Sequence, residues 1–216
     1  MQSALIDNIK ISHLLGNITA LRDHETSAHS IEVTYLSSIL AQKLNLDNTV
    51  VQNLMKGAYV HDIGKVGIPD KILLKQASFD DEEWKIMKQH PTLGADLLRD
   101  INWYKEAIDV VLYHHEKYDG SGYPYGLKGN NIPYIARIFA IIDVFDALVR
   151  IRPYKKAFSL DKAIDIIQKD SETHFDPDIV KVFLPLAKKF YDIITNNTED
   201  QLKQKLIEKR IEIFGI

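Results

Sequence analysis

Apolar residues recur three or four positions apart along most of the chain, which is the spacing of helices that bury one face. In residues 1–20 this spacing predicts a helix that packs on the domain or joins it to another segment. A second helix is predicted over residues 27–46. A third follows Asp47, a candidate N-cap, and ends at His61 and Asp62, where glycines interrupt the pattern.

Caps and prolines divide the middle of the chain. Asp80 or Asp81 is expected to cap a short helix that closes at His90, because the residue before a proline is disfavoured in helical geometry. Its inward side chains are expected to be Trp84, Ile86 and Met87. Another helix is predicted from Trp103 to His115, and it leads into a loop dense in glycine.

The second half of the chain also shows helical patterns. Residues 134–149 form the most hydrophobic of the predicted helices, and its charged interruptions are Arg137, Asp143 and Asp146. Three more helices are predicted, over residues 160–168, 177–191 and 200–213. The sequence shows no confident strand pattern and no internal repeat. The predicted fold class is therefore all-α.

Composition narrows the possible functions. Hydrophobic residues make up 45% and charged residues 26% of the chain, as in ordinary globular proteins. The formal net charge of −3 argues against binding to nucleic acid polymers, so an anionic ligand would need a local basic patch. No apolar stretch is long enough to span a membrane and no secretory pattern begins the chain, so the cytoplasm is the expected location.

The length of 216 residues suits one domain with extensions. We expect an amino-terminal helix or connector over residues 1–20, a main domain over residues 21–195 and a carboxy-terminal helix over residues 196–216. The chain has no cysteine, which excludes disulfides and thiolate metal ligands. Any metal site must therefore use histidine and carboxylate ligands.

Histidines and carboxylates gather at the predicted helix ends. The candidates are Glu25, His29, His61, Asp62, His90, His114, His115 and Asp143. Taken singly, most of them have a simpler explanation. A solvated helix surface accounts for Glu25 and His29, and a salt bridge to an arginine accounts for Asp143. Taken together, five imidazoles and three carboxylates suit iron, manganese or zinc, and they exceed what one ion needs.

Two or three ions held in this way would serve the hydrolysis of a phosphate ester. Paired ions lower the pKa of a bridging water and neutralise the charge that develops on the leaving oxygen. Asp62 is the best candidate for a carboxylate shared between ions, and His61 for a ligand of one of them. The glycine-dense loop over residues 116–126 must take its shape from packing or from a ligand.

Several ordered segments carry a family resemblance. The main ones are His61-Asp62-Ile63-Gly64-Lys65, His114-His115-Glu116 and Asp119-Gly120-Ser121-Gly122-Tyr123-Pro124. Further matching segments are Glu25-Thr26-Ser27-Ala28-His29, Lys88-Gln89-His90-Pro91, Asp143-Val144-Phe145-Asp146-Ala147-Leu148 and Arg152-Pro153-Tyr154-Lys155. In this order they resemble the HD-GYP family of metal-dependent phosphohydrolases, over roughly Leu21 to Phe183. The resemblance implies an HD-type helical bundle with a metal site at its centre and a Gly-Tyr-Pro loop.

The resemblance also implies an activity and a set of site residues. The activity is that of a phosphodiesterase, which uses a metal-activated water to open cyclic di-GMP to linear pGpG and, in many members, goes on to GMP. The implied metal ligands are His29, His61, Asp62, His90, His114, His115 and Asp143, with Glu25 as the extra carboxylate of members that hold three ions. Asp62 and Lys65 are the implied catalytic residues. The implied substrate-binding residues are Lys65, Arg152, Lys155 and Tyr123.

The same resemblance suggests cofactors and partners. Two or three divalent ions are expected, with iron first and manganese as the alternative. The Gly-Tyr-Pro loop would shape the wall of the pocket or present a surface to a diguanylate cyclase or another protein. The sequence is also compatible with a homodimer.

The chain departs from the family pattern at a few positions. Glu32 stands where an arginine is usual, Val149 and Arg150 replace a Thr-Ser pair, and Glu172 replaces a glycine. None of these positions is an implied metal ligand. Two alternatives to the cyclic di-GMP phosphodiesterase therefore stay open: a phosphohydrolase of another nucleotide, and an interaction module that binds metal and cyclic di-GMP with little or no turnover.

Overall fold

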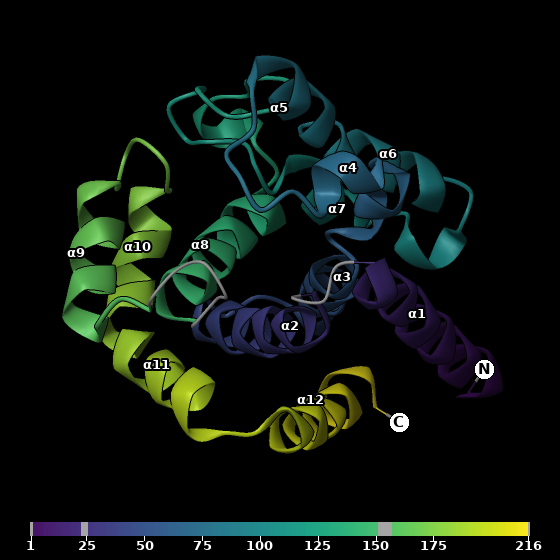
Figure 1. The fold of residues 1–216 in the computed structure, drawn as a ribbon. Helices are drawn as coiled ribbons and strands as arrows, with labels where there is room; N and C mark the ends of the chain where they lie inside the picture. The colour runs from purple at the N-terminus through teal and green to yellow at the C-terminus, as the bar shows by residue number, and fades with distance from the viewer. Residues whose placement is uncertain (1, 23–25, 151–156, 216) are drawn as a thin grey trace.

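The computed structural model describes residues 2–22, 26–150 and 157–215, and within these ranges every helix or strand element is helical (Figure 1). The α-helices are α1 (Gln2–Arg22), α2 (Thr26–Lys43), α3 (Asn48–Tyr59), α4 (Asp70–Leu73), α5 (Asp81–Met87), α6 (His90–Leu98), α7 (Ile108–Tyr113), α8 (Tyr134–Val149), α9 (Leu160–Lys169), α10 (Pro177–Phe183), α11 (Ala187–Asn196) and α12 (Glu199–Phe214). Short 3-10 turns are η1 (Ile63–Gly67), η2 (Asn102–Tyr104), η3 (Gly129–Asn131) and η4 (Leu184–Leu186). The all-α prediction is confirmed.

Helices α2, α3 and α8 form the centre of the bundle and pack on one another (Figure 1). Helix α8 has the bounds that its hydrophobic run predicts, because the Ile132-Pro133 turn begins it and the apolar run ends at Val149. Phe139 and Phe145 on this helix are fully buried. The centre of the core is thus one nearly apolar helix, α8, packed against α2, which is buried on most of its surface, and against α3.

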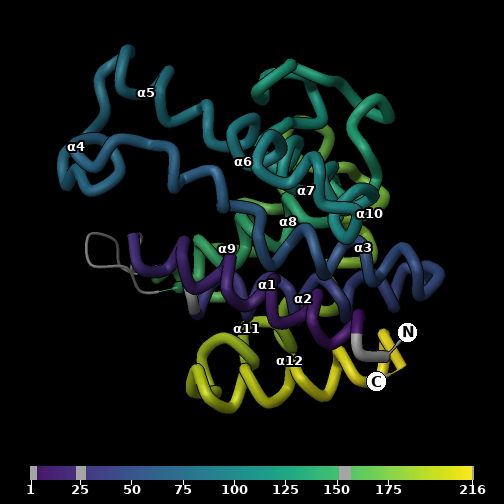
Figure 2. The backbone as a smooth tube through the Cα atoms, turned by 90° about the vertical axis from the view of Figure 1, so that its right-hand side faces the viewer, coloured from purple at the N-terminus to yellow at the C-terminus, as the bar shows by residue number. Residues whose placement is uncertain are grey.

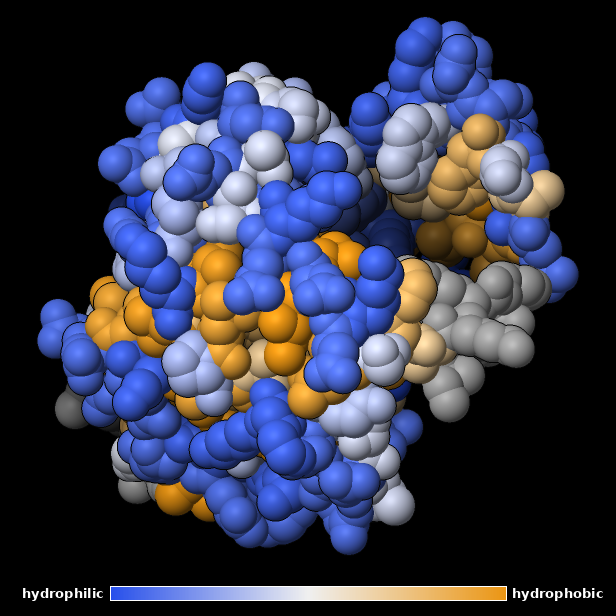
Figure 3. Space-filling view, turned by 90° about the vertical axis from the view of Figure 1, so that its left-hand side faces the viewer, coloured by the Kyte–Doolittle hydropathy of each residue, from blue (hydrophilic) through white to orange (hydrophobic). Residues whose placement is uncertain are grey.

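The other helices surround this centre. Helices α9, α10 and α11 pack on one side of α8, α7 packs on α3 and α8, and α6 packs on α7 and η1. Figure 2 shows α4 and α5 extending away from the bundle, with α12 along the opposite end. In Figure 3, hydrophobic residues form a band across one face, and a hollow separates the rest of the surface from a lobe that is hydrophilic at its tip and hydrophobic beneath. No helix in the described ranges is long and apolar enough to cross a membrane.

The cap predicted at Asp80 is confirmed, and Asp176 caps α10 in a similar way. The Asp80 side chain accepts a hydrogen bond from the Glu83 backbone N–H, 2.9 Å away, in a reciprocal capping box. The Asp176 side chain accepts from the backbone N–H of Asp178, also at 2.9 Å. Asp47 precedes α3 as predicted, but its side chain makes no capping hydrogen bond.

The predicted helix bounds are wrong at four places. The helix predicted to close at His90 ends at Met87, and His90 begins α6. The helix predicted over residues 27–46 ends at Lys43, because Asn45 adopts a φ of 55°. The helix predicted over residues 103–115 is split into η2 and α7, where the Ala107 carbonyl comes so close to α3 that a Cβ on Gly57 would lie 2.5 Å from its oxygen. The helix predicted over residues 177–191 is interrupted by η4, which contains Pro185.

One inward side chain was also predicted wrongly. Trp84 is 43% exposed, whereas Met87 on the same helix is buried. The Trp84 ring stacks on Phe79 instead, with ring centroids 5.7 Å apart, because α5 extends from the bundle and has only a small apolar cluster beneath it. The domain limits at residues 20 and 196 stay predictions.

Candidate metal centre

Three helix ends bring histidines together. His61 and Asp62 follow the last turn of α3, His90 begins α6, and His114 caps the end of α7. The imidazoles of His61, His90 and His114 are each about 2% exposed. The short apolar helices before these residues place polar rings inside the bundle, so the rings need hydrogen-bond or metal partners.

Each of these three rings is oriented by a backbone carbonyl of the helix that precedes it. The Nδ1 atoms of His61, His90 and His114 lie 2.8, 2.9 and 2.9 Å from the carbonyl oxygens of Ala58, Met87 and Val111, respectively. A carbonyl accepts hydrogen bonds, so this geometry assigns the proton to Nδ1. The unprotonated Nε2 atom of each ring therefore faces the centre of the bundle, as it does in histidines that bind metal.

Asp62 lies between two groups of ligand atoms. One group is His29, His61 and Asp143, and the other is His90, His114 and His115; within each group the atoms lie within 4.8 Å of one another. Asp62 Oδ2 is 3.3 Å from His61 Nε2, and Asp62 Oδ1 is 3.3 Å from His90 Nε2 and 3.9 Å from His114 Nε2. A carboxylate with one oxygen toward each group has the arrangement of a bridging ligand.

His29 is held by two carboxylates from α8. Its Nε2 atom lies 3.1 Å from Asp143 Oδ1, and its Nδ1 atom lies 2.7 Å from Asp146 Oδ2. Asp146 is completely buried, and sequence reasoning identified it only as a charged interruption of the helix. Its spacing of three residues from Asp143, on the same helix face, was the available signal. Asp146 orients a candidate ligand and does not belong to either group of ligand atoms.

The ionisation of the site favours cation binding. Burial lowers the pKa of His114 well below its usual value and lowers that of His115 to about 3, so both rings are neutral donors. Burial alone would raise the pKa of Asp62, but the Lys65 ammonium and the neighbouring imidazoles outweigh it and hold this pKa well below its usual range. For His29, the nearby carboxylates of Asp146 and Asp143 outweigh the effect of burial and raise the pKa to about 9.

These donors fit divalent metal ions. Neutral imidazole nitrogens and ionised carboxylates are the ligands that iron, manganese and zinc accept, and here they lie in a buried site. The raised pKa of His29 reflects two facing carboxylates, and a cation at its Nε2 atom would take the place of that proton.

Lys65 lies at the edge of the site. Its Nζ atom is 2.9 Å from Asp62 Oδ2, and its side chain is 22% exposed. Lys65 belongs to η1, whose Gly64 touches α6 so closely that a Cβ there would lie 1.8 Å from the His90 carbonyl oxygen. This contact fixes His61 and Asp62 relative to His90.

The loop after His115 is attached to the site at two points. The Tyr123 ring stacks on His115, with centroids 4.7 Å apart and planes 27° apart. The buried Glu116 carboxylate accepts hydrogen bonds from the backbone N–H groups of Tyr125 at 2.7 Å and Leu127 at 3.0 Å. Sequence reasoning quoted Glu116 only as part of a motif, and its role in holding the loop was missed.

The structure thus brings most of the predicted site residues together. His29, His61, Asp62, His90, His114, His115 and Asp143 lie around one centre, with Lys65 and Tyr123 at its edge. Three predicted residues, Glu25, Arg152 and Lys155, lie outside the described residues.

The family model of the HD domain matches residues 13–179. The chain belongs to the HD domain family. The match spans the whole candidate metal centre of this HD domain, from His29 to Asp143. The predicted family and the HD-type helical fold are confirmed.

Curated relatives and a solved structure agree with this assignment. A cyclic di-GMP phosphodiesterase of Vibrio cholerae is 41% identical over 83% of this chain and 39% of its own length, and one of Thermotoga maritima is 38% identical over 88% and 52%. A 3′3′-cGAMP-specific phosphodiesterase of Vibrio cholerae is 37% identical over 79% of this HD-domain chain and 33% of its own length. A Bdellovibrio bacteriovorus structure described as an HDG"Y"P protein has a TM-score of 0.62 and 25% identity, covering 76% of this chain and 54% of that one. The chain spans about half the length of these relatives or less.

Proposed function

We propose that the chain is a metal-dependent phosphodiesterase that hydrolyses cyclic di-GMP, with pGpG or GMP as the product. One observation carries the proposal: Asp62 points one oxygen toward each of two histidine groups, with the Lys65 ammonium 2.9 Å away. The names of the relatives at 38–41% identity support the same activity.

The two groups of ligand atoms have separate roles in the proposal. His29, His61 and Asp143 would hold one cation, His90, His114 and His115 would hold a second, and Asp62 would offer one oxygen to each. When bound, the cations would acidify a water and neutralise charge on the phosphate. Around them, the backbone carbonyls and Asp146 keep the histidine rings in the orientation that exposes one nitrogen of each ring.

Lys65 acts on the scissile phosphate in the proposal. Its ammonium lies next to Asp62, so it stands where negative charge would develop on the phosphate and the leaving oxygen. It stabilises that charge or donates a proton to the leaving oxygen. Tyr123 binds substrate as a neutral phenol, because burial raises the pKa of its hydroxyl.

Other parts of the proposal rest on residues outside the described ranges. Arg152 and Lys155 would bind the phosphate or guanine of cyclic di-GMP, since arginine and lysine supply the local positive charge that an acidic protein needs. Glu25 would hold a third ion. We propose iron as the metal and manganese as its alternative, because both accept mixed nitrogen and oxygen ligands.

The activity is tested by incubating iron-loaded or manganese-loaded protein with cyclic di-GMP and separating the products by chromatography. Formation of pGpG or GMP by the wild type, and none by Asp62→Ala, is the expected result. No product with either metal would contradict the phosphodiesterase. A parallel incubation with 3′3′-cGAMP distinguishes the substrate, because relatives of this chain carry both names.

The main alternative is an interaction module. It would bind cyclic di-GMP tightly without hydrolysing it and would use the Gly-Tyr-Pro loop to contact a diguanylate cyclase or another protein. Binding without product would favour it. Location in the cytoplasm and assembly as a homodimer also remain proposals.

A further inference from the structure

A cavity lies away from the candidate metal centre, where α1, α3 and α12 meet. It has a volume of about 310 Å³, which is within the lower range of small-molecule sites. Its polar lining includes His13, Asn17, Lys203 and Arg210, and its apolar lining includes Leu206 and Ile207. An apolar wall with several convergent polar groups is typical of a ligand pocket.

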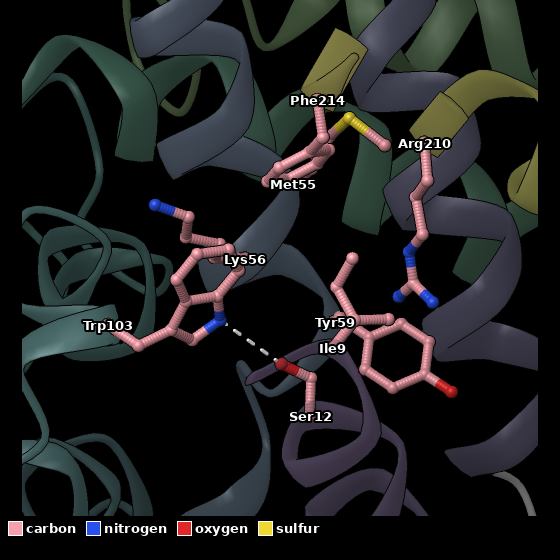
Figure 4. Close-up of a pocket in the computed structure, with 8 residues that line it drawn as sticks. All are labelled: Ile9, Ser12, Met55, Lys56, Tyr59, Trp103, Arg210 and Phe214. Carbon is pink, nitrogen blue, oxygen red and sulfur yellow. Dashed lines mark hydrogen bonds between the residues drawn. The ribbon is translucent and has the colours of Figure 1, made fainter. Parts of the chain in front are cut away.

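Arg210 is the unusual residue of this cavity. It is only 7% exposed, and its guanidinium lies over the Tyr59 ring at 4.6 Å from the centroid. Figure 4 shows this arrangement from the adjoining pocket, with Arg210 from α12 above the ring of Tyr59 from α3. Within the described part of the chain, no carboxylate forms an ion pair with Arg210. Buried arginines are normally paired, because an uncompensated charge in the interior is costly.

The neighbours of Arg210 do not neutralise its charge. Arg210 Nη1 lies 2.5 Å from His13 Nε2, and His13 Nδ1 lies 3.2 Å from the Tyr59 hydroxyl oxygen. Burial and the guanidinium lower the pKa of His13 to about 4, so the imidazole accepts from Arg210 as a neutral ring. Lys203 is already paired with Glu199 at 2.8 Å. The cavity therefore holds a net positive charge next to apolar side chains.

A second cation, Lys56, lines the adjoining pocket but not this cavity. The Lys56 ammonium is 4.1 Å from the centre of the Trp103 ring, and burial lowers its pKa. Figure 4 shows Lys56 and Trp103 on the other side of the pocket from Arg210, with the Trp103 N–H directed at Ser12. Lys56 donates a hydrogen bond to Asn53 at 3.0 Å. Because the asparagine amide is neutral, this contact does not compensate the charge of Lys56.

We propose that this cavity binds a small organic anion, whose oxyanion group pairs with Arg210 and whose apolar part contacts Leu206 and Ile207. A carboxylate, sulfonate or phosphate monoester would share this chemistry. The ligand completes the ion pair that Arg210 lacks within the described residues, and the cavity is large enough for a ring-sized body. The proposal is independent of the phosphodiesterase activity.

Benzenesulfonate is a suitable probe, because it combines one oxyanion with an apolar ring and is a weak metal ligand. Titration into the metal-loaded full chain, followed by calorimetry, should give saturable binding with a Kd of about 1 mM or tighter. Benzyl alcohol, the uncharged control, should not bind measurably. The absence of binding by benzenesulfonate would overturn the proposal.

Two variants place the binding at this cavity. Arg210→Met should weaken binding at least about tenfold. Ile207→Glu should do the same by adding a competing carboxylate at the cavity wall, and since Ile207 is 46% exposed the variant should fold. Ile211→Glu is the matched control, because Ile211 is 49% exposed on the same helix but does not line the cavity. Equal binding by Ile207→Glu and Ile211→Glu would overturn the assignment.

A third variant separates this site from the metal centre. Asp62→Asn should leave benzenesulfonate binding unchanged, whatever its effect on turnover. Binding that is lost in Asp62→Asn and kept in Arg210→Met would place the probe at the metal centre and overturn the proposal. A failure of the phosphodiesterase assay alone would not affect this result.

Discussion

Arg150 forms an ion pair with Glu32, across the contact between α8 and α2. Its Nε atom also lies 3.2 Å from Asp146 Oδ2, the oxygen that faces His29 Nδ1. Glu32 and Arg150 are both positions at which the chain departs from the HD-GYP pattern. The two departures therefore meet in one contact. The family usually has an arginine at the position of Glu32 in α2, and here an arginine, Arg150, lies at the end of α8 instead.

Removing one partner of this ion pair should destabilise the protein. Arg150→Met or Glu32→Met leaves the other charge in a site that is mostly shielded from water, and we expect a loss of about 3 kcal/mol in the free energy of unfolding. The double variant should recover part of that loss, because neither charge of this pair is left alone, while the contact of Arg150 with Asp146 stays lost. Urea unfolding of the four proteins measures this; additive losses would contradict a direct pairing.

Asp62→Asn should remove metal from both groups of ligand atoms. The low pKa of Asp62 makes it a carboxylate at neutral pH, and an amide has only one acceptor oxygen and no charge to offer to two cations. Elemental analysis of purified protein should show a clear fall in bound metal relative to Asp165→Asn, an exposed aspartate on α9. Unchanged metal content would exclude the bridging role.

The third-ion prediction depends on Glu25. Glu25→Ala should lower the metal content by about one ion per chain, with the other ligands in place. The same elemental analysis measures it, with the wild type as the reference. A constant ratio of metal to protein would exclude Glu25 as a ligand.

Glu116→Gln should loosen the Gly-Tyr-Pro loop. The glutamine amide has one acceptor oxygen and no charge, so one of the two part-buried N–H groups loses its carboxylate partner, at a cost of about 1 kcal/mol. Hydrogen exchange of these two amides should become faster while metal content is retained. Glu106→Gln, at an exposed position, is the control. Unchanged exchange would show that Glu116 does not hold the loop.

Stability should fall in mild acid, in part through His174. Burial, with the nearby Lys117, lowers the pKa of His174 from 6.5 to about 4, so between these values the unfolded chain binds more protons than the folded chain. The free energy of unfolding therefore falls as the pH falls from 6.5 toward 4. His174→Phe keeps a ring against Phe175 and should reduce the loss between pH 7 and pH 5 by about 1 kcal/mol. Parallel urea unfolding at both pH values measures it, and an equal loss in both proteins would contradict it.

The sequence predicted the elements that depend on local pattern. The bounds of α8 follow from a continuous apolar run after a proline, and the Asp80 cap follows from side-chain chemistry within four residues. The break between η2 and α7 was not predictable, because it depends on a close approach to Gly57 in another helix. The same holds for Trp84, whose exposure depends on how far α5 extends from the bundle.

The candidate site divides in the same way. The family motif identified His61 and Asp62 as site residues, because the two ligand types stand next to each other in the sequence. The role of Asp146 was missed because its partner His29 is 117 residues away, and a carboxylate in an apolar helix does not show in sequence which group it meets. Tertiary contact decides between an ion pair and a ligand at such positions.

The hydrogen bonds from His61, His90 and His114 to carbonyls three residues earlier have a consequence for how such a site is inherited. The direction of each ring is fixed by a hydrogen bond within four consecutive residues. The orientation of the metal-facing nitrogen is therefore a local property of each helix end. Loops between these helices can lengthen, shorten or change sequence without rotating any donor. To preserve the arrangement of the three histidine nitrogens, it is sufficient that the distances between the helix ends are maintained.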